Sequence, residues 1–141
     1  MNFGQVIADM KKLRGVRLGS IRPGAEITIL EVDEAEGRVV VETKSGEKRS
    51  RSLQEIRRVW SELCTKPAVH VDAALKGSGS SRNQPETILA NLPYVEWFRY
   101  NNKKHITLVG RATHPLGTLK EMDPVDRSST VWRHMWARGR R

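Results

Sequence analysis

This sequence lacks the features that stabilise secreted proteins or anchor membrane proteins. Its 141 residues include one cysteine, Cys64, which excludes an internal disulfide. No apolar run approaches the roughly 20 residues that a membrane-spanning helix needs. The N-terminal residues lack the apolar core of a signal peptide. These absences favour a cytoplasmic protein without a membrane partner.

Signatures of catalysis and of cofactor binding are missing too. His70 has no cysteine or second histidine at the spacing of a zinc site. The Gly- and Ser-rich residues 77–81 lack the lysine of a phosphate-binding loop. The carboxylates between positions 31 and 36 cluster in a predicted turn, without the basic partner that a metal-dependent nuclease would need. We therefore expect no enzyme activity, no metal and no cofactor.

Negative charge is in the minority. The chain has 25 Lys and Arg against 16 Asp and Glu, which gives a formal net charge of +9 and a pI near 10.2. A basic excess of this size attracts polyanions, and nucleic acid is the first partner to consider. The length suits one compact domain or two small ones.

Residues 52–109 carry a sequence of predicted elements. Ser52 and Glu55 predict a capping box at the start of a helix with apolar residues at helical spacing. A short extended piece, a short helix and the polar turn at 77–81 follow. Asn83 and Glu86 predict a second capping box, for a helix over 84–92. Two strand-like runs, 94–100 and 105–109, then predict a hairpin joined by residues 101–104.

The order of these elements resembles a winged helix-turn-helix DNA-binding domain. Residues 77–97 also resemble accessory DNA-reading domains of bacterial restriction-type proteins, which implies a role in restriction or defence. In a helix-turn-helix the second helix lies in the major groove and faces base edges. The resemblance implies base contacts by polar residues on the outer face and at the start of that helix: Arg82, Asn83, Gln84, Thr87 and Asn91. It implies phosphate contacts by Ser80 and Ser81 before the helix, and by Lys103 and Lys104 at the hairpin tip.

Residues 1–51 have the pattern of a second, smaller unit. A helix is predicted to end near Gly15, and three short antiparallel strands are predicted over 26–32, 37–43 and 47–51. This unit resembles a small SH3-like barrel or a curled sheet. Lys48, Arg49 and Arg51 on the last strand either contact phosphate or protect an exposed sheet edge.

The last third contains an extended segment and then a helix predicted over 128–138. Trp132, Met135 and Trp136 lie on one side of that helix. We expect them to be buried, either on the body of the chain or across a two-fold interface of a homodimer, because aromatics and Met are enriched at interface centres. The tail carries three arginines that can follow a phosphate backbone: Arg138, Arg140 and Arg141.

The sequence thus predicts an α+β fold in three parts. These are an SH3-like β-unit with an N-terminal helix (1–51), a winged-helix-like domain (52–109) and an extended segment with a C-terminal helix (110–141). The predicted function is non-catalytic binding of duplex DNA, directed by sequence or by structure. The alternative is a protein-docking adaptor or RNA-binding module that uses the winged helix and the Trp-rich helix as its surfaces.

Overall fold

The first half of the chain forms a four-stranded antiparallel sheet between two helices. A computed structural model describes residues 2–71 and 83–139. After α1 (Phe3–Lys12), the strands β1 (Arg17–Gly19), β2 (Glu26–Asp33), β3 (Arg38–Thr43) and β4 (Lys48–Ser52) pair in chain order, and α2 (Leu53–Thr65) follows. The positions predicted for three strands are confirmed within one residue. The short β1 was not predicted.

The alternation of side chains explains how this sheet buries one face. Val39 and Val41 of β3 are fully buried, whereas Arg38 at the start of the strand is exposed and Val40 between the two valines is partly exposed. In β2, Ile27 and Ile29 are buried in the same way. A register shift between Ile29 and Glu31 places a bulge at the end of this apolar pair. One face of the sheet therefore lies on the core and the other is in solvent.

The start of α2 differs in detail from the prediction. The Ser52 hydroxyl accepts from the backbone N–H of Gln54 at 3.0 Å, so Ser52 caps the helix as expected. The Glu55 carboxylate forms an ion pair with Arg51 across one turn. The predicted return bond from Glu55 to Ser52 is therefore wrong, because a charged guanidinium is the stronger partner for that carboxylate.

The second sheet is a hairpin with additional chain segments on both sides. After α4 (Asn83–Ala90), β5 (Val95–Tyr100) pairs with β6 (Lys103–Leu108). Val69 adds an antiparallel bridge to Ile106 on the outer side of β6. On the outer side of β5, the Trp97 N–H donates to the Lys120 carbonyl at 3.1 Å, and the Met122 N–H donates to the Trp97 carbonyl at 2.9 Å. The extended piece at Val69, the hairpin and the segment around Lys120 and Met122 therefore form one small sheet.

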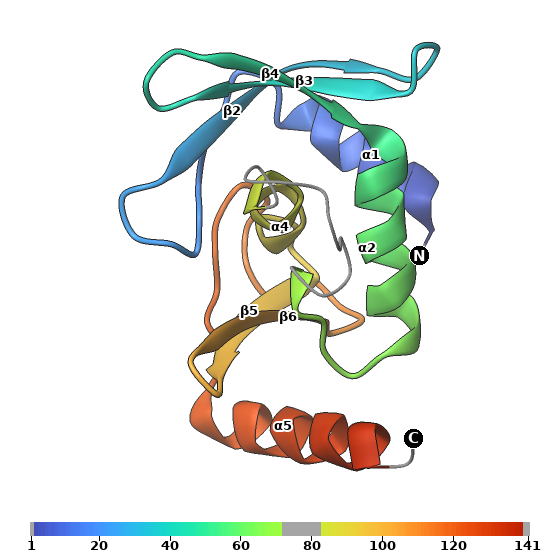
Figure 1. The fold of residues 1–141 in the computed structure, drawn as a ribbon, viewed down its shortest axis with the longest axis vertical. Coiled ribbons are helices and arrows are strands. Elements are labelled where there is room, and N and C mark those ends of the chain that lie inside the picture. Colours follow the sequence, from blue (N-terminus) through green and yellow to red (C-terminus); the bar gives the residue numbers. More distant parts are fainter. Residues whose placement is uncertain (1, 72–82, 140–141) are drawn as a thin grey trace.

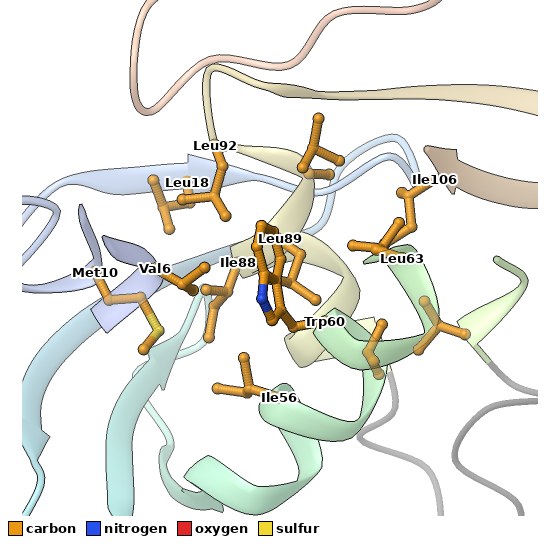
Figure 2. Packing of buried hydrophobic residues seen from close by; sticks show 14 of the residues in the cluster. Val6, Met10, Leu18, Ile56, Trp60, Leu63, Ile88, Leu89, Leu92 and Ile106 are labelled. Atoms are coloured by element: carbon orange, nitrogen blue, oxygen red, sulfur yellow. The ribbon is translucent and has the colours of Figure 1, made fainter. Parts of the chain in front are cut away.

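The main hydrophobic core draws on both halves of the chain. One cluster of buried side chains includes residues of α1, the first sheet, α2, α4 and the hairpin. Figure 2 shows Ile88, Leu89 and Leu92 at its centre, with Trp60 of α2 beside them. In Figure 1, α4 accordingly lies in the middle of the molecule, between the first sheet and the hairpin.

The final helix, α5 (Pro124–Gly139), lies under the hairpin at the end of the molecule farthest from the first sheet (Figure 1). It begins four residues earlier than predicted. Val131 packs against a smaller cluster formed by Ala68, Phe98 and Met122. Among the residues described, no helix combines the length and the apolar character needed to cross a membrane.

Candidate nucleic-acid interface

The helix expected to read bases is buried. Gln84 is 5% exposed, and Thr87 and Asn91 are fully buried. The prediction that these three side chains lie on an outer face is wrong. Because α4 packs against α2, β1 and β5 together, it has no outer face of the kind that a groove-inserted helix needs.

Hydrogen bonds to distant residues explain why polar side chains are stable in this core. The Thr87 hydroxyl lies 2.6 Å from that of Ser20. The Asn91 amide nitrogen donates to the backbone carbonyls of Gly19 at 3.0 Å and of Thr87 at 2.8 Å. A buried polar group that keeps such partners avoids most of the cost of losing water. These side chains thus join α4 to the strand β1 and the residue that follows it.

A further buried contact ties the connection between α4 and β5 to α1. The Tyr94 hydroxyl donates to the Asp9 carboxylate at 2.7 Å, and both residues are buried. Burial first, and then this hydrogen bond and the negative charge of Asp9, raise the pKa of Tyr94 well above its usual 10.0. Tyr94 is therefore a neutral donor at any physiological pH.

The basic residues of β4 differ in exposure and in ion pairing. Lys48 is exposed, and Arg49 is exposed but paired with Glu47. The Arg51 side chain is only 11% exposed and is paired with Glu55. Register does not separate these two arginines, because Arg51 lies opposite Val39 and Arg49 opposite Val41, and both valines are fully buried. Their partners differ: Glu55, which pairs with Arg51, lies in the first turn of α2, whereas Glu47, which pairs with Arg49, is exposed. Arg51 is thus wrong as a surface phosphate contact, whereas Lys48 and Arg49 stay predictions.

The hairpin tip contains asparagines rather than lysines. Asn101 and Asn102 form a two-residue turn with φ of 53° and 60°, which is the conformation that Asn tolerates best after Gly. Lys103 and Lys104 belong to β6, so the predicted four-residue basic tip is wrong. Lys103 is exposed. Lys104 is partly buried, and its ammonium lies 3.3 Å from the buried carboxylate of Glu86.

Several candidate residues fall outside what the structure describes. Ser80, Ser81, Arg82, Arg140 and Arg141 are not among the described residues, and the side chains of Asn83 and Arg138 are not described. Their predicted contacts with bases and phosphates therefore stay predictions.

Three histidines gather where α5 meets the hairpin. The ring of His105 lies 5.4 Å from that of His70 and 5.1 Å from that of His134, and it stacks on Phe98. No group of His, Cys, Asp and Glu in the described part of the chain has the arrangement of a metal site. The rings pack as aromatic side chains and hold α5 on the hairpin.

A cavity of about 350 Å³ lies nearby, between the hairpin and α5. Arg111 and Arg133 line it, but so do the carboxylates of Glu96 and Asp126. Glu96 is buried and pairs with Lys120 at 3.2 Å. Because both signs of charge line this cavity, it does not have the character of a phosphate site.

The most exposed apolar surface lies on α5. Trp132 is 65% exposed, Met135 and Trp136 are each 52% exposed, and Val125 is 80% exposed. Trp132 and Trp136 stack with their ring centroids 6.3 Å apart and their planes 9° apart. The prediction that these side chains are buried on the body of the chain is wrong, because α5 turns Thr130, Val131 and His134 to the body instead. The other predicted place for them, a two-fold interface, stays a prediction.

Comparison with known proteins adds no assignment: no family model matches this sequence, and no curated protein or solved structure shows significant similarity to it.

Proposed function

We propose that this chain is a non-catalytic nucleic-acid-binding protein that holds the phosphate backbone and does not read bases with α4. The observation that carries this proposal is the charge balance. If every Asp and Glu paired with its own cation, nine of the 25 Lys and Arg residues would still have no carboxylate. An excess that the protein cannot neutralise by itself attracts a polyanion.

The second sheet supports the same proposal. α2, the Val69 bridge, α4 and the β5–β6 hairpin follow one another in the order of a winged helix-turn-helix. Winged helices also contact nucleic acid outside the second helix, through hairpin and backbone contacts. With α4 in the core, the cations available for such contacts include Lys48, Arg57, Arg58 and Lys103, all of which are exposed.

The salt dependence of binding tests this proposal. If about six phosphates are contacted, the logarithm of the affinity for random duplex should fall with the logarithm of the salt concentration at a slope of about −5. A slope shallower than about −2 would contradict phosphate binding. Competition between duplex DNA and structured RNA would then identify the preferred nucleic acid.

Two neighbouring lysines provide a matched pair of variants. Lys103 is exposed, whereas Lys104 forms an ion pair with buried Glu86. Lys103→Gln should reduce the salt slope by about 1, since one phosphate contact is lost. Lys104→Gln should lower the stability of the fold and leave the slope unchanged. Equal slopes for wild type and Lys103→Gln would exclude this part of the hairpin from the interface.

A second candidate function is protein docking, favoured by the exposed tryptophans of α5. Exposed apolar clusters of this kind mark interaction sites. An apolar docking site responds little to salt, so the same titration separates the two candidates.

A further inference from the structure

The cavity between the hairpin and α5 joins buried polar groups to the surface. Its volume of about 350 Å³ lies at the lower end of the range for small-molecule sites. Glu96, which is 3% exposed, and the buried Thr107 line its inner part. Arg111 and Arg133 also line it and are exposed, so they lie at its mouth. The cavity therefore has room for one small molecule that reaches from the mouth to the buried groups.

The strand side of the cavity presents two hydrogen-bond acceptors next to each other. Glu96 of β5 lies directly opposite Thr107 of β6 in the strand register, so both side chains are on the same face of the hairpin. The Thr107 hydroxyl donates its proton to the Pro67 carbonyl at 2.6 Å, which leaves only its lone pairs for another group. An ionised carboxylate has no proton to donate. A group that fits against this wall therefore needs N–H or O–H donors.

The carboxylate of Glu96 has few partners for a buried group, and the one it has is a cation. Its Oε2 atom lies 3.2 Å from the Lys120 ammonium. Within residues 2–71 and 83–139, its Oε1 atom accepts no hydrogen bond. A donor from a ligand would reduce the cost of burying this carboxylate. Because Lys120 already places a positive charge there, a neutral donor fits better than a second cation.

The mouth of the cavity favours an anion. In the described part of the chain, the exposed Arg111 belongs to no ion pair. Arg133 uses one guanidinium nitrogen in a hydrogen bond within α5, and its others can bind a ligand. Together with Asp126 and the pair of Glu96 and Lys120, these arginines leave one positive charge in excess. The ligand that complements the whole cavity thus has a neutral, donor-bearing head and a negatively charged tail.

Apolar side chains complete the lining. Met122 is buried, and Leu108 and Val109 are partly buried. Such side chains fit the faces of a flat aromatic ring, and a methionine sulfur makes favourable contacts with one. Guanine is a neutral ring of this kind that carries two donors side by side, its N1–H and its 2-amino group. A carboxylate can accept from both at once, and the phosphate of a nucleotide supplies the negative charge.

We propose that this cavity holds the guanine base of an unpaired nucleotide. The N1–H and the 2-amino group donate to Glu96, the second hydrogen of the amino group is directed to Thr107, and the phosphate lies at the mouth beside Arg111 and Arg133. The choice of a nucleotide among neutral donors rests on the proposed binding of nucleic acid. A base inside a duplex has its donors occupied and its faces stacked, so the guanine must be a free nucleotide or an unpaired residue of a strand.

Binding of mononucleotides to the full chain, measured by isothermal titration calorimetry, tests this site. GMP should bind about 10-fold more tightly than AMP, CMP or UMP, because a bidentate pair discriminates against bases that cannot form it. IMP is the sharpest comparison, since it is GMP without the 2-amino group. It should also bind about 10-fold more weakly than GMP. Equal affinities for GMP and IMP would contradict the pairing with Glu96.

A change at the buried carboxylate tests the same contact from the side of the protein. Glu96→Gln keeps the shape of the side chain and removes its charge. It should bind GMP about 10-fold more weakly and should no longer distinguish GMP from IMP. Glu121→Gln is the matched control, because Glu121 is an exposed carboxylate of the same segment as Lys120 and does not line the cavity. This control should bind like the wild type.

A change at the mouth keeps the proposal testable even if Glu96→Gln does not fold. Arg111 is exposed, so Arg111→Gln should keep the fold. It should weaken the binding of GMP about 3- to 10-fold and leave the binding of guanosine unchanged, because guanosine has no phosphate. Arg22→Gln, at an exposed arginine between β1 and β2, is the control and should change neither.

Three outcomes would overturn the proposal. One is the absence of GMP binding at about 1 mM. Another is a folded Glu96→Gln variant that still prefers GMP to IMP. The third is an Arg111→Gln variant that weakens GMP and guanosine equally.

These outcomes are separate from the salt titration of duplex binding. A steep salt slope without GMP binding would remove this site and leave backbone binding intact, whereas GMP preference with a shallow slope would leave the site and remove duplex binding. Competition by a short single strand with one guanine identifies the source of the base. A strand that competes better than GMP indicates an unpaired residue, and one that competes worse indicates a free nucleotide.

Discussion

The helices α4 and α5 differ in a way that their compositions do not suggest: polar side chains of α4 are buried, and tryptophans of α5 are exposed. α4 carries Gln84 and Thr87, Asn91 follows it directly, and all three are buried, whereas α5 carries Trp132 and Trp136 and exposes them. This difference shows that the burial of a side chain depends on the packing and hydrogen-bond partners around it as much as on its own polarity. Thr87 and Asn91 hydrogen-bond to Ser20 and to Gly19 of β1, which offsets part of the cost of losing water. Among the described residues, the side-chain oxygens of Gln84 and Asn91 have no hydrogen-bond partner. The tryptophans of α5 lie on the side of the helix that faces away from the hairpin.

The largest effect on stability is expected when a large core side chain of α4 is truncated and leaves a cavity. Leu89 is fully buried in the main core, so Leu89→Ala should lower the free energy of unfolding by about 2–5 kcal/mol. Denaturant titration measures this change. A loss below about 1 kcal/mol would show that α4 is not a core helix.

A smaller loss is expected for the hydroxyl pair that joins α4 to the first sheet. Thr87→Val should cost about 1–3 kcal/mol, because the buried Ser20 hydroxyl loses the partner that lies 2.6 Å away. Ser20→Ala should cost a similar amount for the same reason. The double variant should cost less than the two single changes together, by about 1 kcal/mol. Additive losses in this double-mutant cycle would contradict the bond.

The contact between Tyr94 and Asp9 should appear as a pH dependence. The folded chain holds the Tyr94 proton more tightly than the unfolded chain does, because the pKa of Tyr94 is raised above 10.0. Its stabilising contribution is therefore complete below pH 10.0 and is lost as the pH rises beyond that value. Tyr94→Phe should cost about 1–3 kcal/mol at neutral pH. The stability difference between wild type and variant should then shrink in alkali, and a constant difference would contradict this assignment.

The smallest effect is expected on the exposed side of α5. Trp132→Ser should change the free energy of unfolding of the dilute protein by less than about 0.5 kcal/mol, because the side chain is 65% exposed. Thermal unfolding at low concentration measures this. A loss as large as that of Leu89→Ala would show that Trp132 packs on its own chain.

Local patterns were enough to predict much of the fold. Alternation of valines and isoleucines placed β2 and β3, and the apolar spacing from Leu53 to Leu63 placed α2. β1 was missed because three residues are too few for a period. The environment of α4 was missed because its partners, Gly19 and Ser20, lie 72 and 67 residues away in the sequence. Contacts over that separation leave no local signal.

At the candidate site, too, local patterns predicted the exposure of side chains along a strand but not their contacts with distant residues. Exposure of Lys48 and Lys103 agrees with the pattern of charges along their strands. The ion pairs of Arg51 with Glu55 and of Lys104 with Glu86 depend on how strands and helices pack. Lys104 and Glu86 are 18 residues apart across the end of α4 and the hairpin, so a charge count could not show that this lysine is occupied.

Hydrogen exchange of backbone amides in the dilute protein most directly tests the claim that α4 is the central core helix and that α5 is held less tightly at the surface. The amides of Leu89 and Ala90 in α4 should exchange only through opening of the whole fold, with a free energy close to that of global unfolding. The amides from Trp132 to Met135 in α5 should exchange through local opening at a clearly lower free energy. If the α4 amides exchange as easily as those of α5, then α4 is not the central core helix and this account of the molecule is wrong.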